Sequence, residues 1–490
     1  MSSDLPGTVV MADVSETAGK LAGSAVLLIG RKVAGSVLSA VSSIVVVRSL
    51  LPGEFGEYAA GLAAFYMLLA LTEFGFSEVF GRALGQKKVD AAALGRLVLK
   101  ANLVWSSIVA AAAVVIAGFF AYDSTRGGTL LVMAPAVALA GTTAMRQFFY
   151  AKHEVGRMAT VDLSTAIIST IAIVGSASLG APAVLLAAFA SAAAVVNSLV
   201  MLRVASQWMS PRDAADGDAA GVQSPVHLIK EAFPIGFASF LSTAYVSIDV
   251  VILSNIFPAE VVGQYASAVK LFSILTIFPG LVMSIALPQL AAEWDEPDRM
   301  GVLLSRLWHW FMSLVMPGLV IVAANARGVM TLLFGDTYGE VGPILRILAV
   351  AGAVSMLTQL LGVVVVAAAR ARWLVGQNII ALAFNVGGNL LFAPRFGISA
   401  SAWLTVATEV IVCGGSWLIL RDRIPCAALS RVSLLPTAAV AVAVAIGWIF
   451  VATPWMALTV SAVAYVLALS ALRGWPVEMV RMIPSIARPR

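Results

Sequence analysis

The chain has 490 residues, of which 60% are hydrophobic and only 12% are charged, and its mean hydropathy is +0.95. Soluble globular chains carry roughly twice this proportion of charged residues, so the composition excludes a soluble protein and predicts an integral membrane protein. No nucleic-acid partner is expected. The two cysteines, Cys413 and Cys426, predict neither a disulfide framework nor a metal site. No cofactor is expected.

Apolar segments long enough to cross a membrane recur along the whole chain, since a spanning helix needs about 20 residues. In chain order we expect spans at Gly23–Leu50, Ala59–Phe80, Leu97–Ala121, Leu130–Tyr150, Thr160–Leu179, Pro182–Val204, Ala232–Phe257, Val262–Leu290, Val302–Ala324, Ile344–Ala369, Trp373–Phe392, Ile398–Leu420, Leu434–Val451 and Trp455–Leu472. None shows the alternation of a membrane β-barrel strand. The sequence therefore predicts an all-α integral membrane fold with about 14 transmembrane helices.

The longest polar connection, 209–228, predicts the boundary between two halves of the chain. We expect one six-helix bundle over 23–208 and a second over 229–425. Residues 426–490 hold two additional helices and a basic tail. Residues 1–22 are polar and mildly acidic and lack the features of a secretory signal, so the first span is expected to remain.

Most Lys and Arg residues fall in alternate loops, which fixes the expected orientation because basic loops remain on the cytoplasmic side. The opposite side receives only Arg48, Arg126, Arg327, Arg346 and Arg395. Both termini and the 209–228 linker are therefore expected to be cytoplasmic. The connection after the first span is expected to face outward.

The second half repeats the first. The stretch "LPGEFGEYAAG" at 51–61 is matched by "FPAEVVGQYASA" at 257–268, and "ALGQ" at 83–86 is matched by "ALPQ" at 286–289. Corresponding positions are separated by six spans, an even number, so both halves keep the same orientation. This arrangement is typical of a parallel repeat related by an axis along the membrane normal. The last two spans have no counterpart in the first half.

Two motifs carry a resemblance to a known family. "VVRSLLPGEFGEYAAG" at 46–61 and the span ending "EFGFSEVFGRALG" at 73–85 resemble the N-terminal signature of the polysaccharide transporter, or oligosaccharide flippase (Wzx-type), family, and "PAEVVGQYASAVKL" at 258–271 resembles its second element. The family belongs to the multidrug/oligosaccharidyl-lipid/polysaccharide exporter superfamily. The resemblance implies two six-helix bundles in a V and alternating access. It also implies a polyprenyl-diphosphate-linked oligosaccharide moved from the cytoplasmic to the outer leaflet, as a step in exopolysaccharide synthesis.

Charged residues inside apolar segments are the candidate site residues, because such charges are costly in a membrane and usually face a cavity or a partner. They are Arg31, Lys32, Glu73, Glu78, Arg146, Asp162, Asp249, Lys270 and Glu409. Asp249 and Lys270 lie at comparable depth on consecutive spans. They could form a structural ion pair, or they could line the cavity, with Lys270 binding diphosphate and Asp249 releasing it.

The remaining candidates also allow two interpretations. Arg31 and Lys32 either anchor the first span at the cytoplasmic surface or bind an anionic substrate. Glu73 and Glu409 are candidates for ion coupling or charge relay, with satisfied structural polarity as the alternative. Pro279–Gly280 predicts either a hinge or a purely structural bend, since proline removes a helix hydrogen bond.

The leading hypothesis is a flippase, and not an enzyme, in the bacterial inner membrane. No G-x-x-x-x-G-K-[ST] loop is present, so transport by nucleotide hydrolysis through that motif is not expected. The expected partners are the lipid-linked saccharide, membrane lipid, H+ or Na+ as coupling ion, and polysaccharide polymerase or assembly proteins. The alternatives are a cation-coupled multidrug exporter of the same fold and a membrane polysaccharide polymerase or ligase.

Overall fold

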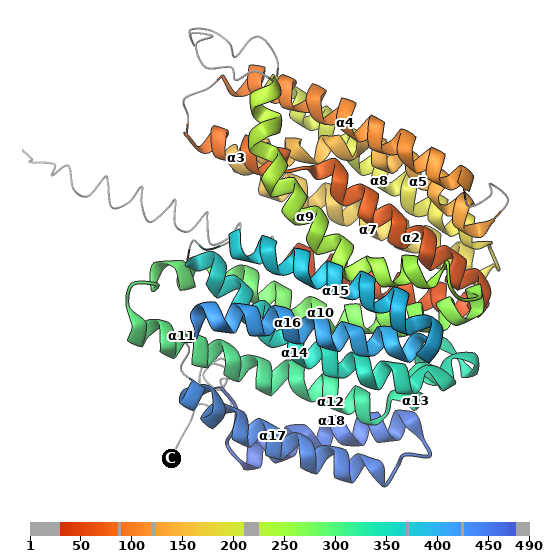
Figure 1. Cartoon of the computed structure of the whole chain (residues 1–490), viewed down its shortest axis with the longest axis vertical. Coiled ribbons are helices and arrows are strands. Elements are labelled where there is room, and N and C mark those ends of the chain that lie inside the picture. Colours follow the sequence, from red (N-terminus) through yellow and green to blue (C-terminus); the bar gives the residue numbers. More distant parts are fainter. Residues whose placement is uncertain are drawn as a thin grey trace, which may run out of the picture. The chain divides into compact units, whose positions relative to one another are not determined.

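A computed structural model gives the structure of residues 30–86, 90–119, 124–209, 225–368, 370, 372–422 and 426–476 (Figure 1). These residues form helices joined by short turns, and they contain no strand. Helices satisfy their backbone hydrogen bonds internally, as a chain without access to water requires. The all-α prediction is confirmed.

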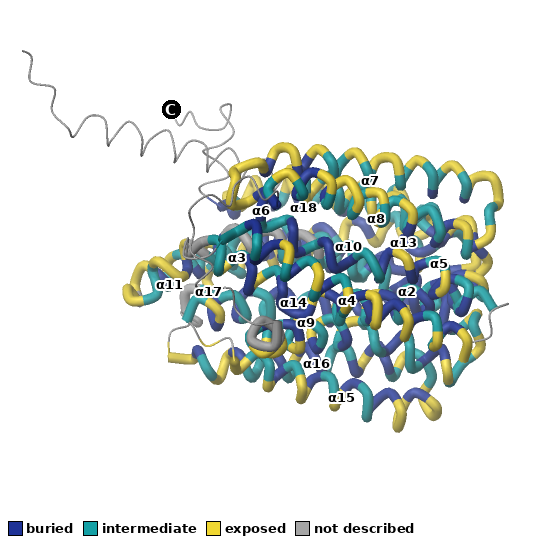
Figure 2. The backbone as a smooth tube through the Cα atoms, turned by 90° about the horizontal axis from the view of Figure 1, so that it is seen from above, coloured by how far each residue is buried: buried dark blue, intermediate teal, exposed yellow. Residues whose placement is uncertain are grey.

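Thirteen helices in the described part of the chain are long and apolar enough to cross a membrane, and each overlaps one predicted span. The remaining predicted span, Val262–Leu290, lies within α10 (Ala259–Ala292), a helix of 34 residues. Several large apolar side chains are strongly exposed, among them Phe119 (85%) and Leu179 (89%). Exposure of this kind suits contact with lipid rather than water. Figure 2 shows exposed positions along α7 (Val155–Ser178) and α15 (Arg372–Phe396).

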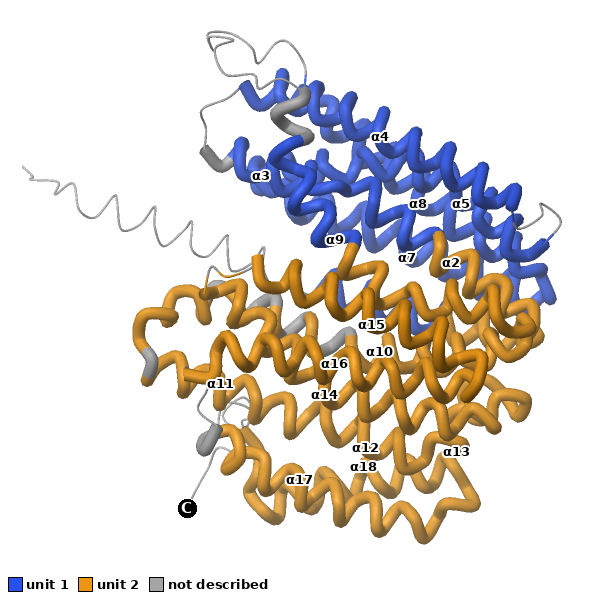
Figure 3. Tube along the Cα trace, viewed as in Figure 1, with its two compact units in different colours: residues 1–42, 65–240 blue, residues 43–64, 241–490 orange. Residues whose placement is uncertain are grey.

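The chain divides into two compact units (Figure 3). Unit 1 contains residues 1–42 and 65–240, and unit 2 contains residues 43–64 and 241–490. The division at the 209–228 linker stays a prediction, and residues 210–224 lie outside the described residues. The end of the first span and the start of the second pack with unit 2, and the start of the seventh packs with unit 1.

Unit 1 is a bundle built on consecutive helices. Its elements are the helix from Gly30, the later part of α2 (Pro52–Glu73), α3 (Phe76–Gln86), α4 (Ala91–Phe119), α5 (Thr125–Leu139), the 3-10 helix η1 (Ala140–Met145), α6 (Arg146–Ala151), α7, α8 (Ala183–Ala205), the 3-10 helix η2 (Ser206–Met209) and the first part of α9 (Pro225–Leu253). Buried aromatic side chains, including Phe80 and Phe148, form its core. Gly75 and Phe74 separate α2 from α3 with positive φ angles. Gly236 packs against the Phe74 backbone so closely that a Cβ would overlap it.

Unit 2 contains the remaining helices, with the strongly buried α14 in its interior. Its elements are the start of α2, the end of α9, α10, α11 (Pro297–Trp310), the π-helical turn η4 (Phe311–Val315), α12 (Met316–Ala324), α13 (Ala326–Phe334), the 3-10 helix η5 (Asp336–Val341), α14 (Gly342–Ala367), α15, α16 (Ile398–Leu420), α17 (Cys426–Trp448) and α18 (Pro454–Ala471). Small residues allow close helix packing there, as is usual in membrane proteins.

The repeated motif has a direct structural role within unit 2. In both copies a proline begins the helix, Pro52 at the start of α2 and Pro258 just before α10, and a glutamate lies in the first turn. The two helix starts then pack against each other. A Cβ at Gly56 would overlap the Ala259 carbonyl oxygen, and a Cβ at Gly263 would overlap the Pro52 carbonyl oxygen. Glycine is thus required twice because each copy is the other's packing partner.

The two C-terminal helices are attached to the ninth predicted span by specific hydrogen bonds. Pro317 has no N–H, so it cannot donate to the Ser313 carbonyl four residues earlier. The Tyr465 hydroxyl on α18 donates to that carbonyl instead, at 2.8 Å, in a buried position. Trp308 donates to the Ser433 hydroxyl on α17 at 2.8 Å. The last helices therefore replace a backbone bond that the π-helical turn and proline leave open.

Candidate functional site

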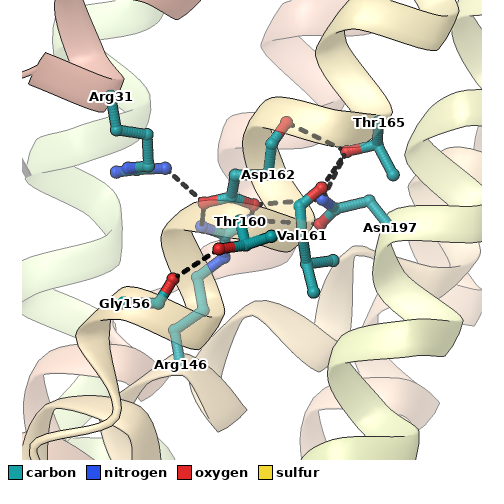
Figure 4. Close-up of polar contacts among 8 residues, drawn as sticks. All are labelled: Arg31, Arg146, Gly156, Thr160, Val161, Asp162, Thr165 and Asn197. Atoms are coloured by element: carbon teal, nitrogen blue, oxygen red, sulfur yellow. Dashed lines mark hydrogen bonds and ion pairs between the residues drawn. The ribbon is translucent and has the colours of Figure 1, made fainter.

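The first polar cluster lies in unit 1 and is centred on Asp162 of α7 (Figure 4). Arg146, the first residue of α6, donates from both terminal nitrogens to the two carboxylate oxygens of Asp162, each at 2.8 Å. Arg31, at the start of the first described helix, donates to the same carboxylate from the other side. Two guanidinium groups therefore share one carboxylate.

Asn197 of α8 completes this cluster. Its amide nitrogen donates to Asp162 at 3.0 Å and to the Thr165 hydroxyl at 2.9 Å, and its amide oxygen accepts from Arg146 at 3.2 Å. Asp162 thus accepts four hydrogen bonds, and a carboxylate has about four acceptor positions. Its side chain is 10% exposed, compared with 24% for Arg31 and 28% for Arg146.

The cluster has a net positive charge, because two arginines face one aspartate. The Arg31 Nε atom is buried and has no hydrogen-bond partner in the described part of the chain. Guanidinium groups present a planar fork that matches carboxylate and phosphate oxygens. The arrangement can therefore bind an additional anion chemically, provided that the anion reaches the arginines.

Lys32 and Glu73, two other candidate site residues of the first half, take no part in these hydrogen bonds. Lys32 is exposed, and its carbonyl oxygen accepts from the Ser36 hydroxyl at 2.8 Å. Glu73, the last residue of α2, is also exposed. The charge of Arg146 acts on Glu73, so this carboxylate belongs to the surroundings of the cationic cluster. Their predicted roles in substrate binding and ion coupling remain predictions.

The second polar cluster is a buried carboxylate pocket in unit 2. Asp249 of α9 is 5% exposed and accepts a hydrogen bond of 2.5 Å from the Tyr265 hydroxyl on α10, which is fully buried. Its other oxygen accepts from the backbone N–H of Val250 at 2.8 Å. Asp249 therefore has no cationic partner among the described residues; its hydrogen bonds come from a neutral hydroxyl and a neutral amide.

Glu409 of α16 is the second carboxylate of this pocket and is 7% exposed. The Tyr245 hydroxyl on α9 donates to its Oε1 atom at 2.7 Å. Its Oε2 atom is buried without a hydrogen bond from any described residue, although Ser355 and Thr358 of α14 lie beside the carboxylate. One acceptor atom is therefore left open inside the protein.

Both carboxylates line one enclosed cavity of about 40 Å³. Its polar lining residues, contributed by α9, α10, α15 and α16, are Tyr245, Asp249, Ser273, Asn385, Thr405 and Glu409. Asn389 and Ser401 extend this polar network, since Asn389 donates to Asn385 at 3.0 Å and Ser401 donates to Asn389 at 2.5 Å. The cavity has room for one small ion or one water molecule.

The expected contact between Asp249 and Lys270 does not form. Lys270 is half-buried on α10 and makes no hydrogen bond or ion pair with any described residue. Asp249 accepts a hydrogen bond from Tyr265 instead. Consecutive residues of a helix are rotated by about 100°, so Tyr265 and Lys270, five residues apart, differ by roughly 140° around α10. Two residues at equal depth in the membrane can therefore lie on sides of their helices that do not face each other. The predicted role of Lys270 in binding diphosphate stays a prediction.

The predicted hinge lies in a continuous helix. α10 runs through Pro279 and Gly280 without interruption. A Cβ at Gly280 would come within 3.3 Å of the Gln359 side-chain oxygen on α14, so Gly280 also serves close packing. Whether these residues act as a hinge remains a prediction.

Sequence reasoning missed the neutral partners of the charged residues. Tyr245 and Asn197 complete the two clusters but lie in apolar segments where nothing singles them out, and Tyr265 was visible only as part of the repeated motif. Arg146 and Asp162 were both among the charges inside apolar segments, but the sequence did not pair them. Among the described residues, no group of His, Cys, Asp and Glu has the arrangement of a metal site.

Comparison with known proteins addresses both the sequence and the fold. Residues 45–343 match the family described as "Polysaccharide biosynthesis protein", which is more than half of the chain. No curated protein matches.

Three solved structures similar to this chain cover between 81% and 92% of it. The lipid II flippase MurJ in an inward closed conformation has 12% identity and a TM-score of 0.68, covering 92% of this chain and 98% of that one. An inward-facing MATE-family multidrug resistance transporter of the MOP superfamily has 14% identity and a TM-score of 0.59, covering 81% and 96%. A MOP-superfamily transporter from Pyrococcus furiosus has 15% identity and a TM-score of 0.57, covering 83% and 96%. At these identities the likeness establishes the fold.

Proposed function

The chain belongs to the family of polysaccharide biosynthesis proteins, in agreement with the resemblance of its motifs, and from that premise we propose that it is a lipid-linked oligosaccharide flippase. It moves a polyprenyl-diphosphate-linked oligosaccharide from the cytoplasmic to the outer leaflet of a bacterial inner membrane by alternating access, without performing covalent chemistry. Both termini lie in the cytoplasm, as the distribution of Lys and Arg predicts.

The observation that supports this proposal most strongly is the arginine pair of unit 1. Arg31 and Arg146 hold two guanidinium forks inside apolar helices, where charges are retained mainly for function. Arginine binds phosphate oxygens bidentately and keeps its charge in a poorly hydrated setting. A diphosphate is the anionic part of the proposed substrate. We assign it to these arginines, with Lys32 and Lys270 as further cations along its path.

The carboxylate pocket of unit 2 supports coupling to a cation. Asp249 and Glu409 are buried in one small cavity, and in the described part of the chain only neutral groups donate to them. An isolated buried negative charge is costly unless it is paired. Uptake of H+ or Na+ into this pocket removes the cost, and its release restores it. We therefore assign ion coupling to Asp249 and Glu409, with Glu73 as a secondary candidate in unit 1.

Export in cells tests this function. In a strain whose surface polysaccharide depends on this protein, the double substitution Arg31→Gln with Arg146→Gln is expected to stop export. The lipid-linked oligosaccharide should then accumulate on the cytoplasmic side of the membrane. The matched control is Arg157→Gln, which removes an exposed arginine from α7, the helix that carries Asp162. Control cells should export normally.

Three results would contradict the proposal. Normal export by the double variant would remove the arginines from substrate binding. Accumulation of lipid-linked units on the outer side would instead indicate a polymerase or ligase. If the deletion strain made normal polysaccharide and the protein conferred resistance to cationic drugs, the protein would instead be a multidrug exporter.

A further inference from the structure

Asp162 occupies the position in unit 1 where an anion would bind. Its carboxylate accepts from both arginines of the cluster and from Asn197, so it holds the donors that a phosphate would need. We propose that Asp162 is an internal counter-ion that exchanges with the diphosphate of the substrate: it holds the arginines when the site is empty and yields them when substrate binds. This inference rests on the proposed function and adds a mechanism for binding and release.

The Asp162 carboxylate accepts from both terminal nitrogens of Arg146, each at 2.8 Å. Arg31 donates to the Oδ2 atom that Arg146 also contacts. The Asp162 side chain is only 10% exposed. An anion that is to receive both terminal nitrogens of Arg146 therefore has to take the place of the carboxylate.

The positive charges of the cluster outnumber the negative charge. One carboxylate faces two guanidinium groups, and the buried Nε atom of Arg31 has no acceptor among the described residues. A diphosphate brings more negative charge and more acceptor oxygens than a carboxylate, so it can satisfy donors that Asp162 leaves open. The greater charge and the additional acceptor oxygens of the diphosphate favour its displacement of Asp162. Both anions bind guanidinium groups through oxygen atoms, so the exchange is reversible.

Asp162 and the arginines each keep a hydrogen-bond partner throughout the exchange. Asn197 donates to Asp162 at 3.0 Å and accepts from Arg146 at 3.2 Å, so it contacts both sides of the ion pair. When phosphate takes the arginines, the amide nitrogen of Asn197 still provides a donor for Asp162. When phosphate leaves, Asp162 returns to the arginines, which avoids unpaired charges inside apolar helices.

The alternative is that Asp162 is only a structural tie between the first described helix, α6 and α7. The two roles predict opposite effects of removing the carboxylate. A structural tie positions the arginines, so its loss should weaken anion binding. A competing counter-ion blocks the arginines, so its loss should strengthen anion binding in a protein that still folds.

The test measures pyrophosphate binding by calorimetry on the purified full-length protein in lipid nanodiscs. We expect Asp162→Asn to bind pyrophosphate about tenfold more tightly than the wild type or better, since one hydrogen bond to a charged group contributes about that factor. The same variant should export polysaccharide more slowly, because nothing displaces the bound diphosphate. The control Asn197→Ala leaves the competing carboxylate in place and should not tighten pyrophosphate binding.

Unchanged or weaker pyrophosphate binding by folded Asp162→Asn overturns the exchange. Failure of both Asp162→Asn and Asp162→Ala to give folded protein, while Asn197→Ala folds, also overturns it, because Asp162 is then a structural tie. The proposed function has a separate readout: if Arg146→Gln binds pyrophosphate as well as the wild type does, the arginines are not the phosphate site at all. Loss of binding in Arg146→Gln without tightening in Asp162→Asn would contradict only the exchange.

Discussion

The arginine cluster of unit 1 and the carboxylate pocket of unit 2 are both polar groups within apolar helices, but their charges are balanced differently. In unit 1, Asp162 receives every bond that it can accept, and two of its three partner residues are cationic. In unit 2, Glu409 has one buried oxygen without a hydrogen bond from any described residue, and its donor is the neutral hydroxyl of Tyr245.

This difference indicates what each region can bind. In unit 1 an anion reaches the terminal nitrogens of Arg146 only by exchange, because the Asp162 carboxylate already occupies both of them. A pocket whose carboxylates have neutral donors accepts a cation by addition, because a cation supplies the missing opposite charge. An anionic substrate therefore fits unit 1 and a small cation fits unit 2.

The sharpest test of the contrast compares Arg146→Gln with Glu409→Gln. Arg146→Gln removes two charge-assisted bonds to Asp162, each contributing about 1.5–3 kcal/mol, and should destabilise the protein by about 3–6 kcal/mol. Glu409→Gln replaces a buried carboxylate that has an open acceptor, so the thermal stability should stay equal or rise. Thermal unfolding in detergent measures both. If the two variants lose the same stability, the carboxylate of Glu409 has a partner and the contrast fails.

Lys270 provides the next test, because an ion pair with Asp249 was one of its two interpretations and Asp249 instead accepts a hydrogen bond from Tyr265. If Lys270 binds diphosphate, Lys270→Ala should abolish export at near-normal protein abundance, and Lys270→Arg should retain part of it. The exchange of charges, Asp249→Lys with Lys270→Asp, should not restore export, since the two residues are not partners. Recovered export in the exchanged protein would contradict the assignment of Lys270.

Hydrogen bonds of two tyrosines give the smallest expected effects. Tyr265→Phe removes a bond to a carboxylate and should cost about 1.5–3 kcal/mol of unfolding free energy, whereas Tyr465→Phe removes a neutral bond to the Ser313 carbonyl and should cost about 1 kcal/mol. Chemical unfolding of both variants measures the difference. Equal losses would mean that the Asp249 carboxylate is neutral in the folded protein.

The sequence predicted the fold well because length and hydropathy determine which segments can span a membrane. The repeated proline, glutamate and glycine motif was also visible, but its reason was not: Gly56 and Gly263 pack against each other's helix start, a contact between segments far apart in the chain. Hydropathy contains no information about such pairs. It also could not show that Tyr465 replaces the donor that Pro317 lacks.

The site was only partly predictable for a related reason. Depth along a helix follows from counting residues, so Asp249 and Glu409 could be named as charges inside apolar segments, and the structure shows both to be buried. The facing partner depends on rotation about the helix axis and on the packing of neighbours, which a single sequence does not specify. Charged residues inside apolar segments can therefore be identified from the sequence, whereas neutral partners such as Tyr245 and Asn197 cannot.

The central claim is that the arginines of unit 1 carry an anionic lipid-linked oligosaccharide and the carboxylates of unit 2 take up a cation. The most direct measurement is translocation of a fluorescent polyprenyl-diphosphate oligosaccharide in proteoliposomes, with an imposed H+ or Na+ gradient. We predict gradient-dependent translocation by the wild type. Glu409→Gln should lose the response to the gradient, and Arg31→Gln with Arg146→Gln should lose translocation at every gradient. Translocation by the arginine variant at the wild-type rate would contradict the account.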